Sequence, residues 1–160
     1  MRAKILVLSD SAAAGGREDR SGPALRELLE SHGWVVSACE ILADDQDPIR
    51  QRLEAWTDGG DCDAIFTTGG TGLAPRDVTP EATRAVLDKE VPGLAELMRA
   101  EGLKSTRMAA LSRGVVGVRK GTLIVNLPGS VRGARESLES ILGLLPHTVD
   151  IVQGRTEHGD

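Results

Sequence analysis

Aromatic residues are nearly missing from this sequence, which has one phenylalanine, two tryptophans and no tyrosine among 160 residues. Proteins that bind single-stranded nucleic acids stack the bases on aromatic side chains, so this absence counts against that class. Basic residues are outnumbered as well, and the formal net charge at pH 7 is -5. We expect neither nucleic acid nor an anionic membrane as the main partner, because both attract basic protein surfaces. An anionic ligand would need a local binding site.

Cysteines and long apolar segments are also scarce. The two cysteines, Cys39 and Cys62, have no CxxC spacing and show no sign of a metal site, which favours reduced thiols in a cytoplasmic protein. The apolar run over residues 3–9 is short and precedes a polar loop, as in a first strand and unlike a signal peptide. No segment approaches the length of a transmembrane helix. We expect a cytoplasmic protein without membrane association.

The sequence does contain a regular alternation of β-prone and helical segments. Apolar, β-prone runs predict strands over residues 3–9, 34–42, 62–68, 114–118 and 122–127. Helices are predicted after three cap residues, Ser21, Asp47 and Thr79, each followed within two residues by a proline. Two further helices are predicted over residues 91–102 and 132–145, with Pro146 ending the second and a last turn after it.

This alternation predicts a single α/β domain with a mostly parallel sheet and helices on both faces. The domain would span residues 1–153, and residues 154–160 would form a loose C-terminal tail. In open sheets of this kind, ligands bind beyond the carboxyl ends of the strands, near a switch in strand order. Polar or glycine-rich segments follow the predicted strands at residues 9–10, 44–45, 69–77 and 126–130. We expect these segments to converge on one pocket.

The most conspicuous of these segments lies in TTGGTGLAPRDVTPEAT, residues 67–83. Gly69, Gly70 and Gly72 permit backbone conformations closed to other residues and let a ligand approach the main-chain amides. Such amides can bind phosphate without any net positive charge. The loop is not a P-loop, since no GK[ST] follows the glycines, and it does not match GxGxxG. A compact turn that reverses the chain is the alternative interpretation.

Asp77 in the same loop points to a bound cation. A carboxylate beside a phosphate site repels its ligand unless a cation stands between them, and Mg²⁺ is commonly held by one or two carboxylates and by phosphate oxygens. Asp44 could be the second carboxylate. Alternatively, Asp77 caps the turn before the helix at Thr79, and Asp44 is a solvated loop residue.

Further polar residues could contact an anion near these loops. Ser112 and Arg113 precede a predicted strand, and the segment LPGS at residues 127–130 offers amides and a hydroxyl. Arg113 could clamp a phosphate with two hydrogen bonds, although an arginine at a strand edge is more often a surface charge. Arg76 could equally be the ion-pair partner of Asp77. No Ser-His-Asp or Cys-His set is apparent, so nucleophilic hydrolysis has no support.

The glycine loop, followed by VPGLAELMR, ALSRG and LIVNLPGS and preceded by SDSAAAGGREDRSGPAL, resembles the MogA/MoaB family of molybdenum-cofactor biosynthesis proteins. The motifs cover nearly the whole chain in the same order. The resemblance implies a three-layer α/β/α Rossmann-like domain that assembles as a homotrimer and binds molybdopterin. In the adenylyltransferase members, the terminal phosphate of molybdopterin attacks the α-phosphate of ATP with Mg²⁺ present, giving adenylylated molybdopterin and pyrophosphate. A separate downstream protein then inserts molybdate.

The resemblance also implies which residues form the site. The two functional aspartates of the family match Asp44 and Asp77, which would position Mg²⁺ and ATP. The pterin- and nucleotide-binding contacts match Ser9, Gly69, Gly70, Thr71, Gly72, Ser112, Pro128, Gly129 and Ser130.

Three positions depart from the family pattern. The proline that usually precedes the first aspartate is Ala43, so the assignment could shift to Asp45. The family's LPGSP ends here in Val131, and Ser11 stands where arginine is common, which could remove a ligand contact. Nothing essential to the mechanism is missing. Because paralogues within the family need not all be active, a molybdopterin-binding or scaffold paralogue without catalysis stays open, and so does a generic nucleotide-binding module.

Overall fold

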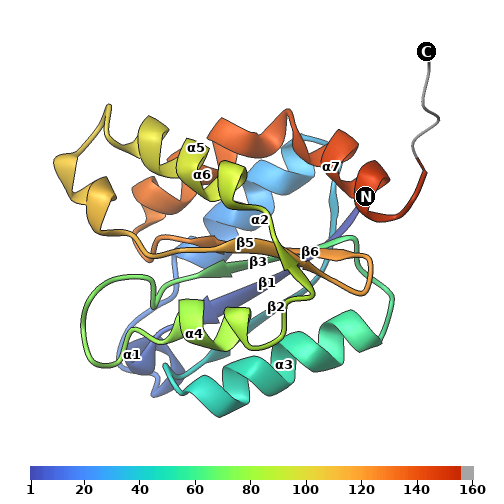
Figure 1. Ribbon diagram of the computed structural model, residues 1–160. Helices are drawn as coiled ribbons and strands as arrows, with labels where there is room; N and C mark the ends of the chain where they lie inside the picture. Colours follow the sequence, from blue (N-terminus) through green and yellow to red (C-terminus); the bar gives the residue numbers. More distant parts are fainter. Residues whose placement is uncertain (156–160) are drawn as a thin grey trace.

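A computed structural model describes residues 1–155, which form three layers with a six-stranded sheet in the middle (Figure 1). The strands are β1 (Arg2–Leu8), β2 (Val35–Leu42), β3 (Ala64–Thr68), β4 (Lys89–Glu90), β5 (Val116–Arg119) and β6 (Thr122–Leu127). Their order across the sheet is β2-β1-β3-β6-β5-β4. The pairs that join β2, β1, β3 and β6 are parallel, whereas β5 and β4 are added in antiparallel fashion. The predicted α/β fold with a mostly parallel sheet is confirmed.

Helices cover both faces of this sheet (Figure 1). One face carries α2 (Ser21–Ser31), α5 (Pro92–Gly102), α6 (Val131–Leu142) and α7 (Leu145–Val152), and the other carries α3 (Gln46–Asp58) and α4 (Thr79–Arg84). Side chains of the strands alternate between two apolar clusters, with Ile5 and Phe66 in the first and Leu6 and Ile65 in the second. Because the sheet is buried on both faces, its strands read as nearly continuous apolar runs.

The carboxyl ends of the parallel strands lie level with one another. Leu8 of β1 pairs with Leu42 of β2, and Thr68 of β3 pairs with Leu127 of β6. From β1 the chain moves outward to β2 and then returns to β3 on the other side of β1. The chain therefore leaves β1 and β3 in opposite directions. The space between the carboxyl ends of these two strands is the switch point, where folds of this kind bind ligands.

The predicted helix caps are each displaced by a residue or two. Ser21 is the first residue of α2 and not its cap, since Asp19 Oδ1 accepts from the amides of Ser21 (3.0 Å) and Gly22 (3.1 Å). Asp47 and Thr79 likewise lie inside the first turns of α3 and α4. The prolines still lie in the first turn of each helix, where a missing N–H has no helical partner to lose.

The C-terminal helix differs from the prediction. α6 ends at Leu142, and Pro146 lies in the first turn of α7, an eight-residue helix in place of the predicted last turn. Three short elements were not predicted: α1 (Asp10–Ala13), β4 and the 3-10 helix η1 (Arg107–Leu111). Each is too short to show a period in the sequence.

The structure also bears on the predictions for the cysteines, the C-terminal tail and transmembrane helices. Cys39 and Cys62 are free, and burial raises the pKa of Cys62 to about 11, so this thiol is unreactive at neutral pH. Arg155, within the predicted tail, pairs with Asp150 at 2.9 Å, and the rest of that tail, residues 156–160, lies outside the described residues. Across residues 1–155, none of the helices combines the length and the apolar character needed to span a bilayer.

Candidate functional site

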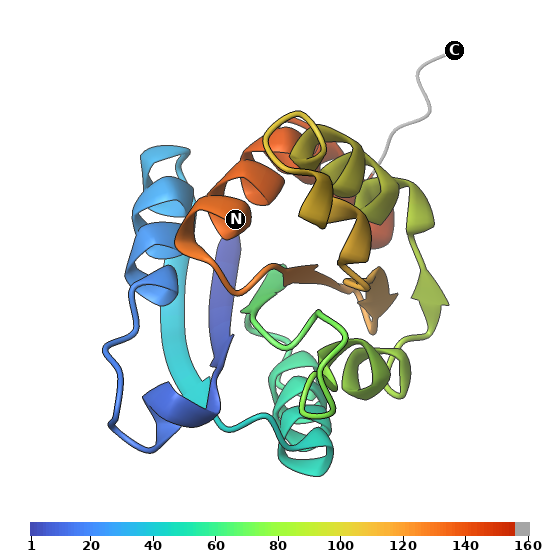
Figure 2. The same cartoon turned by 90° about the vertical axis from the view of Figure 1, so that its left-hand side faces the viewer.

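A pocket of about 490 Å³ lies at the carboxyl edge of the sheet. Figure 2 looks onto this edge and shows the loop after β3 (green) beside α4 and below the segment that contains α5 and η1. The pocket brings together most of the predicted site residues, namely Gly70, Thr71, Gly72, Asp77, Ser112, Pro128, Gly129 and Ser130. The loops after β3 and β6 and the chain before β5 therefore do converge.

Gly69 and Gly70 give the loop after β3 its sharp turn. Both have a positive φ, 102° and 66° respectively. A Cβ atom on Gly69 would lie 2.2 Å from the carbonyl oxygen of Leu8, and one on Gly70 would lie 2.2 Å from Thr79 Oγ1. Only glycine fits at these two positions, where the loop packs against β1 and α4.

The turn leads directly into main-chain amides at the pocket. No main-chain carbonyl within residues 1–155 accepts a hydrogen bond from the amides of Gly70, Thr71 or Gly72, whereas the Gly69 amide donates to Leu127 (3.1 Å). Amides without a protein acceptor in a glycine-rich loop are the donors that bind anions in many proteins. The turn and the phosphate cradle are thus compatible interpretations, since the first creates the second.

Arg113 holds this loop from one side. Its amide donates to the carbonyl of Thr71 (2.9 Å), its Nε to the carbonyl of Gly72 (2.8 Å) and its Nη2 to the carbonyl of Asp77 (2.9 Å). The guanidinium also pairs with Glu81. Most of its donors are therefore engaged by the protein, which argues against the phosphate clamp considered from the sequence.

Asp77 lines the pocket and also closes a turn. Its Oδ2 accepts from the amide of Ala74 (2.9 Å), so Asp77 caps a turn before α4 and also lines the pocket. The suggestion that Arg76 pairs with Asp77 is wrong, because Arg76 pairs with Asp10 (2.8 Å) and Asp45 (3.1 Å). The carboxylate of Asp77 is thereby kept at the pocket without a direct arginine partner.

Asp44 follows β2 and lies behind Gly70. Its Oδ2 accepts from the amide of Asp10 (3.0 Å), whereas its Oδ1 is buried and has no hydrogen-bond partner among residues 1–155. A Cβ atom on Gly70 would lie 3.1 Å from Oδ1, which places the unpaired oxygen beside the glycine loop. Burial raises the pKa of Asp44, and the negative charges of Asp10 and Asp77 raise it further. Such an oxygen is costly to leave unpaired, and a bound ligand would satisfy it.

Asp77 lines the main pocket and Asp44 does not, but both carboxylates flank the glycine loop: a Cβ atom on Gly70 would lie 3.1 Å from Asp44 Oδ1, and one on Gly72 would lie 2.8 Å from Asp77 Oδ2. Within the part of the chain that the structure describes, no three His, Cys, Asp or Glu side chains are grouped so as to hold a metal by themselves. Mg²⁺ commonly uses only one or two carboxylates, with phosphate oxygens and water completing its shell. Asp44 offers an unpaired oxygen for this purpose, whereas Asp45, the alternative first aspartate, is already paired with Arg76.

Hydrogen bonds within the protein involve three of the predicted site residues, Ser112, Pro128 and Ser130. Ser112 Oγ accepts from the amide of Gly114 (3.3 Å), and Ser130 Oγ accepts from an amide in the first turn of α6 (3.0 Å). The carbonyl of Pro128 accepts from the hydroxyl of Thr68 (2.7 Å). Because both serine hydroxyls act as acceptors in these bonds, each retains a proton that it can donate to a ligand.

Ser9 lies outside the main pocket. It lines a smaller pocket of about 90 Å³ together with Gly69 and Gly129, and its Oγ caps α1 by accepting from the amide of Ala12 (3.2 Å). Gly129 borders both pockets, so they are neighbours. The structure thus places Ser9 and Gly69 beside the main pocket and not within it.

One wall of the main pocket was missed at the sequence level. Ala95 and Met98 of α5 and Met108 and Leu111 of η1 line it with apolar atoms, and Arg99 adds a positive charge. An apolar wall that faces a few polar groups is typical of sites for small organic ligands. The apolar positions of the helix were visible in the sequence, but they look the same as positions that face a core.

The fold and the site together define a class of protein: an α/β/α domain with a pocket for a small organic ligand at the carboxyl edge of its sheet, beside the switch point. Residues 4–147 match the family model described as the probable molybdopterin binding domain. The chain therefore belongs to this family, and the resemblance of its motifs is confirmed.

Individual relatives agree with this assignment. The Drosophila melanogaster molybdenum cofactor synthesis protein cinnamon is 45% identical over 92% of this chain, which spans only 25% of that longer protein. The molybdopterin adenylyltransferase of Helicobacter pylori is 43% identical over 94% of this chain and 86% of its own length. Among solved structures, the molybdopterin biosynthesis enzyme MoaB from Thermus thermophilus is 56% identical, with a TM-score of 0.91 and 96% of each chain covered.

Proposed function

We propose that this protein is a molybdopterin adenylyltransferase, which uses Mg²⁺ and ATP to adenylylate molybdopterin ahead of molybdate insertion. The observation that carries the proposal is the unpaired, buried Oδ1 of Asp44 beside a glycine loop whose amides have no main-chain acceptor. Relatives that bear this activity in their name, at 43% identity over most of both chains, support it.

The reaction is a transfer between two polyanions. An oxygen of the terminal phosphate of molybdopterin attacks the α-phosphorus of ATP and forms a new P–O bond. The bond from that phosphorus to the oxygen bridging to the β-phosphate breaks, and pyrophosphate leaves with the electron pair. Because the attacking atom belongs to the substrate, the protein needs no nucleophilic side chain and contributes positioning and charge stabilisation.

Each part of the pocket has a role in this proposal. The amides of Gly70, Thr71 and Gly72 would bind phosphate oxygens, and the hydroxyl protons of Ser112 and Ser130 would donate further hydrogen bonds. The apolar wall of α5 and η1 would cover the organic part of a substrate. Ser9, Gly69, Pro128 and Gly129 would shape the loops around it.

Asp44 and Asp77 would hold Mg²⁺, which when bound supplies the positive charge that two polyanionic substrates require. Without a cation, the two carboxylates would repel the phosphates. Burial, followed by the negative charges of Asp10 and Asp77, raises the pKa of Asp44.

The proposal also covers the protein's setting. We infer a cytoplasmic homotrimer that delivers its product to a separate molybdate-inserting protein, and the family resemblance of the motifs supports each part. Sedimentation equilibrium is expected to give the mass of three chains. A stable monomer would contradict the trimer.

The decisive experiment measures product formation by the purified protein with molybdopterin, ATP and Mg²⁺. Adenylylated pterin and pyrophosphate are quantified with and without EDTA, and Asp77→Asn is assayed in parallel. Asparagine retains an oxygen for the Ala74 amide, so this variant is expected to keep the fold and lose turnover.

Other outcomes point to other functions. Pterin binding by the wild type without any product would establish the non-catalytic scaffold. Nucleotide binding without pterin binding would favour the generic nucleotide module. A fully active Asp77→Asn protein would remove Asp77 from the mechanism.

A further inference from the structure

Asp10 lies between Asp44 and Arg76 and contacts both. Its amide donates to Asp44 Oδ2 (3.0 Å), and its Oδ1 accepts from the amide of Asp44 (2.9 Å). On its other side, Arg76 donates from Nε to Asp10 Oδ2 (3.0 Å) and from Nη2 to Oδ1 (2.8 Å). We call this pair of residues the Asp10–Arg76 clasp.

The clasp connects the ends of three neighbouring strands. Asp10 begins α1 directly after β1, Asp44 follows β2, and Arg76 belongs to the loop after β3. Arg76 also reaches Asp45 at 3.1 Å, so it is bound to both of the other segments. The loop that carries Asp77 is thereby held by Arg76 as well as by Arg113.

The contacts of Asp10 determine which oxygen of Asp44 remains unpaired. Its amide occupies Oδ2, and Oδ1 is left without a partner beside Gly70. Arg76 places a positive charge beside Asp10 through two hydrogen bonds, from Nε to Oδ2 (3.0 Å) and from Nη2 to Oδ1 (2.8 Å). Without Arg76, the carboxylates of Asp10 and Asp44 would repel each other with no cation beside them.

We propose that Asp10 and Arg76 are positioning residues that hold Asp44 with one carboxylate oxygen free toward the glycine loop. Neither residue is among those that line the main pocket, so both act through Asp44 and through the loop of Asp77. The part of this inference that concerns Mg²⁺ and ATP rests on the proposed function, whereas the orientation of Asp44 does not.

A positioning role and a purely structural role predict different results. The side chains of Arg76 and Asp10 are 57% and 46% exposed, and ion pairs this exposed contribute little to stability. Residues that orient a metal-binding group typically change metal affinity or activity by about 10- to 100-fold when they are replaced. The clasp should therefore matter for ligand binding and hardly at all for unfolding.

The test compares Arg76→Gln and Asp10→Asn with the matched control Arg84→Gln. Arg84 pairs with Glu90 at 3.0 Å, with side chains 52% and 46% exposed, and lies outside the main pocket. ATP binding is measured by calorimetry with Mg²⁺ and with EDTA, hydrogen exchange reports on the amides of Asp10 and Asp44, and thermal unfolding checks the fold.

Both clasp variants are expected to bind ATP in the presence of Mg²⁺ about 10- to 100-fold more weakly, with little change in EDTA. Their Asp10 and Asp44 amides should exchange faster, and Arg84→Gln should match the wild type throughout. Arg76→Lys should recover only part of the affinity, because lysine restores the charge but not the two-pronged contact.

The proposal would be overturned if both clasp variants bound ATP in the presence of Mg²⁺ as tightly as the wild type. It would also be overturned if Arg84→Gln lost as much ATP affinity as the clasp variants. If the wild type binds no ATP even with Mg²⁺, the proposed function fails, and hydrogen exchange still decides the question. Unchanged exchange of the Asp44 amide in Arg76→Gln would then refute the positioning role.

Discussion

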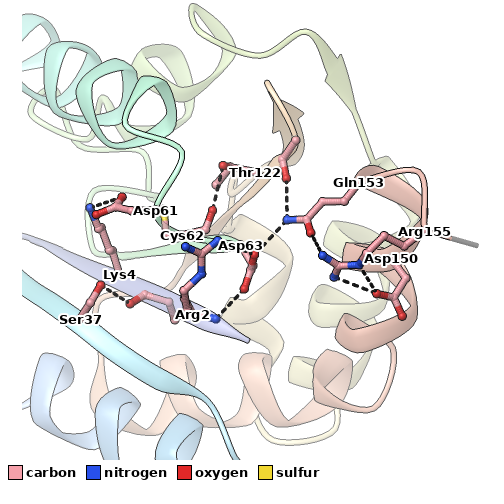
Figure 3. Close-up of polar contacts among 12 residues, drawn as sticks. Arg2, Lys4, Ser37, Asp61, Cys62, Asp63, Thr122, Asp150, Gln153 and Arg155 are labelled. Atoms are coloured by element: carbon pink, nitrogen blue, oxygen red, sulfur yellow. Dashed lines mark hydrogen bonds and ion pairs between the residues drawn. The ribbon is translucent and has the colours of Figure 1, made fainter.

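At the amino edge of the sheet, Asp63 accepts hydrogen bonds from the amide of Arg2 (2.7 Å), from its guanidinium (3.2 Å) and from Gln153 (3.0 Å), as Figure 3 shows. At the carboxyl edge, Asp44 keeps one buried oxygen without any partner among residues 1–155. Asp44 follows β2 and Asp63 precedes β3, so the two aspartates lie at opposite edges of the same sheet. The surrounding donors and the neighbouring charges distinguish them.

Their pKa values shift in opposite directions. Burial raises the pKa of Asp63, but the hydrogen bonds from Gln153 and Arg2 outweigh it and the net shift is downward. The pKa of Asp44 is raised, because burial and neighbouring negative charge exceed the effect of its hydrogen bond. A fully paired carboxylate thus serves the fold, and an unpaired one is held ready for a ligand.

The largest difference between variants of Asp44 and Asp63 should appear in the rate of turnover. Replacing Asp44 with asparagine is expected to reduce adenylylation by about a hundredfold or more, because charge stabilisation at the reacting phosphates is lost. Asp63→Asn should turn over at the wild-type rate. Steady-state assays of both variants at one temperature, well below unfolding, would test this, and equal loss in the two would erase the distinction.

Asn126 sharpens the comparison because it lies at the pocket and yet is fully paired. Its Nδ2 donates to the hydroxyls of Thr67 (3.0 Å) and Thr83 (3.0 Å), and its Oδ1 accepts from the amide of Val115 (3.2 Å). Asn126→Leu leaves the buried Val115 amide unpaired and should cost about 1–3 kcal/mol of unfolding free energy. Urea unfolding measures this, and Thr83→Val, which removes a single partner, should cost less.

Asp63→Asn should resemble Asn126→Leu and not Asp44→Asn. In this variant, an NH₂ group replaces one of the two carboxylate oxygens that accept hydrogen bonds from Arg2 and Gln153. A donor then faces another donor, which should cost about 1–3 kcal/mol of unfolding free energy. Asp150→Asn is the matched control, since Asp150 and its ion-pair partner Arg155 are 46% and 52% exposed. No loss of stability in Asp63→Asn would show that its hydrogen bonds are dispensable.

The smallest expected effect is on how stability depends on pH. The lowered pKa of Asp63 means that its contribution is present at neutral pH and is lost as the pH falls through its folded-state value. The raised pKa of Asp44 has the opposite sign: its charge weakens the fold at neutral pH, and protonation removes that penalty. At pH 7, Asp63→Asn should therefore be less stable than the wild type and Asp44→Asn slightly more stable, with both differences shrinking in acid.

Most of the fold could be predicted because its signals are local. The apolar runs that became β1, β2, β3 and β6 were recognised from composition, and the prolines marked the helix starts to within two residues. Pro146 was misread because a proline that ends one helix and a proline in the first turn of the next look alike when helices follow closely. β4, α1 and η1 depend on the neighbours against which they pack.

The site was predicted in outline and missed in detail. The glycine loop stood out because glycine at positive φ, as at Gly69 and Gly70, leaves a mark in the sequence itself. The LPGS segment stood out because Gly129 packs closely on the same loop, where a Cβ atom would lie 3.3 Å from Gly69 Cα. The apolar wall from α5 and η1 did not, since an apolar side chain at a pocket cannot be told from one in a core. Arg76 was assigned its sequence neighbour Asp77 as a partner, but it pairs with the distant Asp10. Arg113 was considered as a phosphate clamp or a surface charge, but it donates to the carbonyls of Gly72 and Asp77.

The sequence by itself determined the alternation of strands and helices, the edge at which the loops gather and the glycines that bend the loop after β3. These depend on backbone preference and on periodic burial, which act over a few residues. Only the tertiary structure decided which oxygen of Asp44 stays unpaired and which carboxylates Arg76 holds. Those choices depend on contacts between residues 34 and 66 positions apart, which exist only once three strand ends have been brought to the same edge of the sheet.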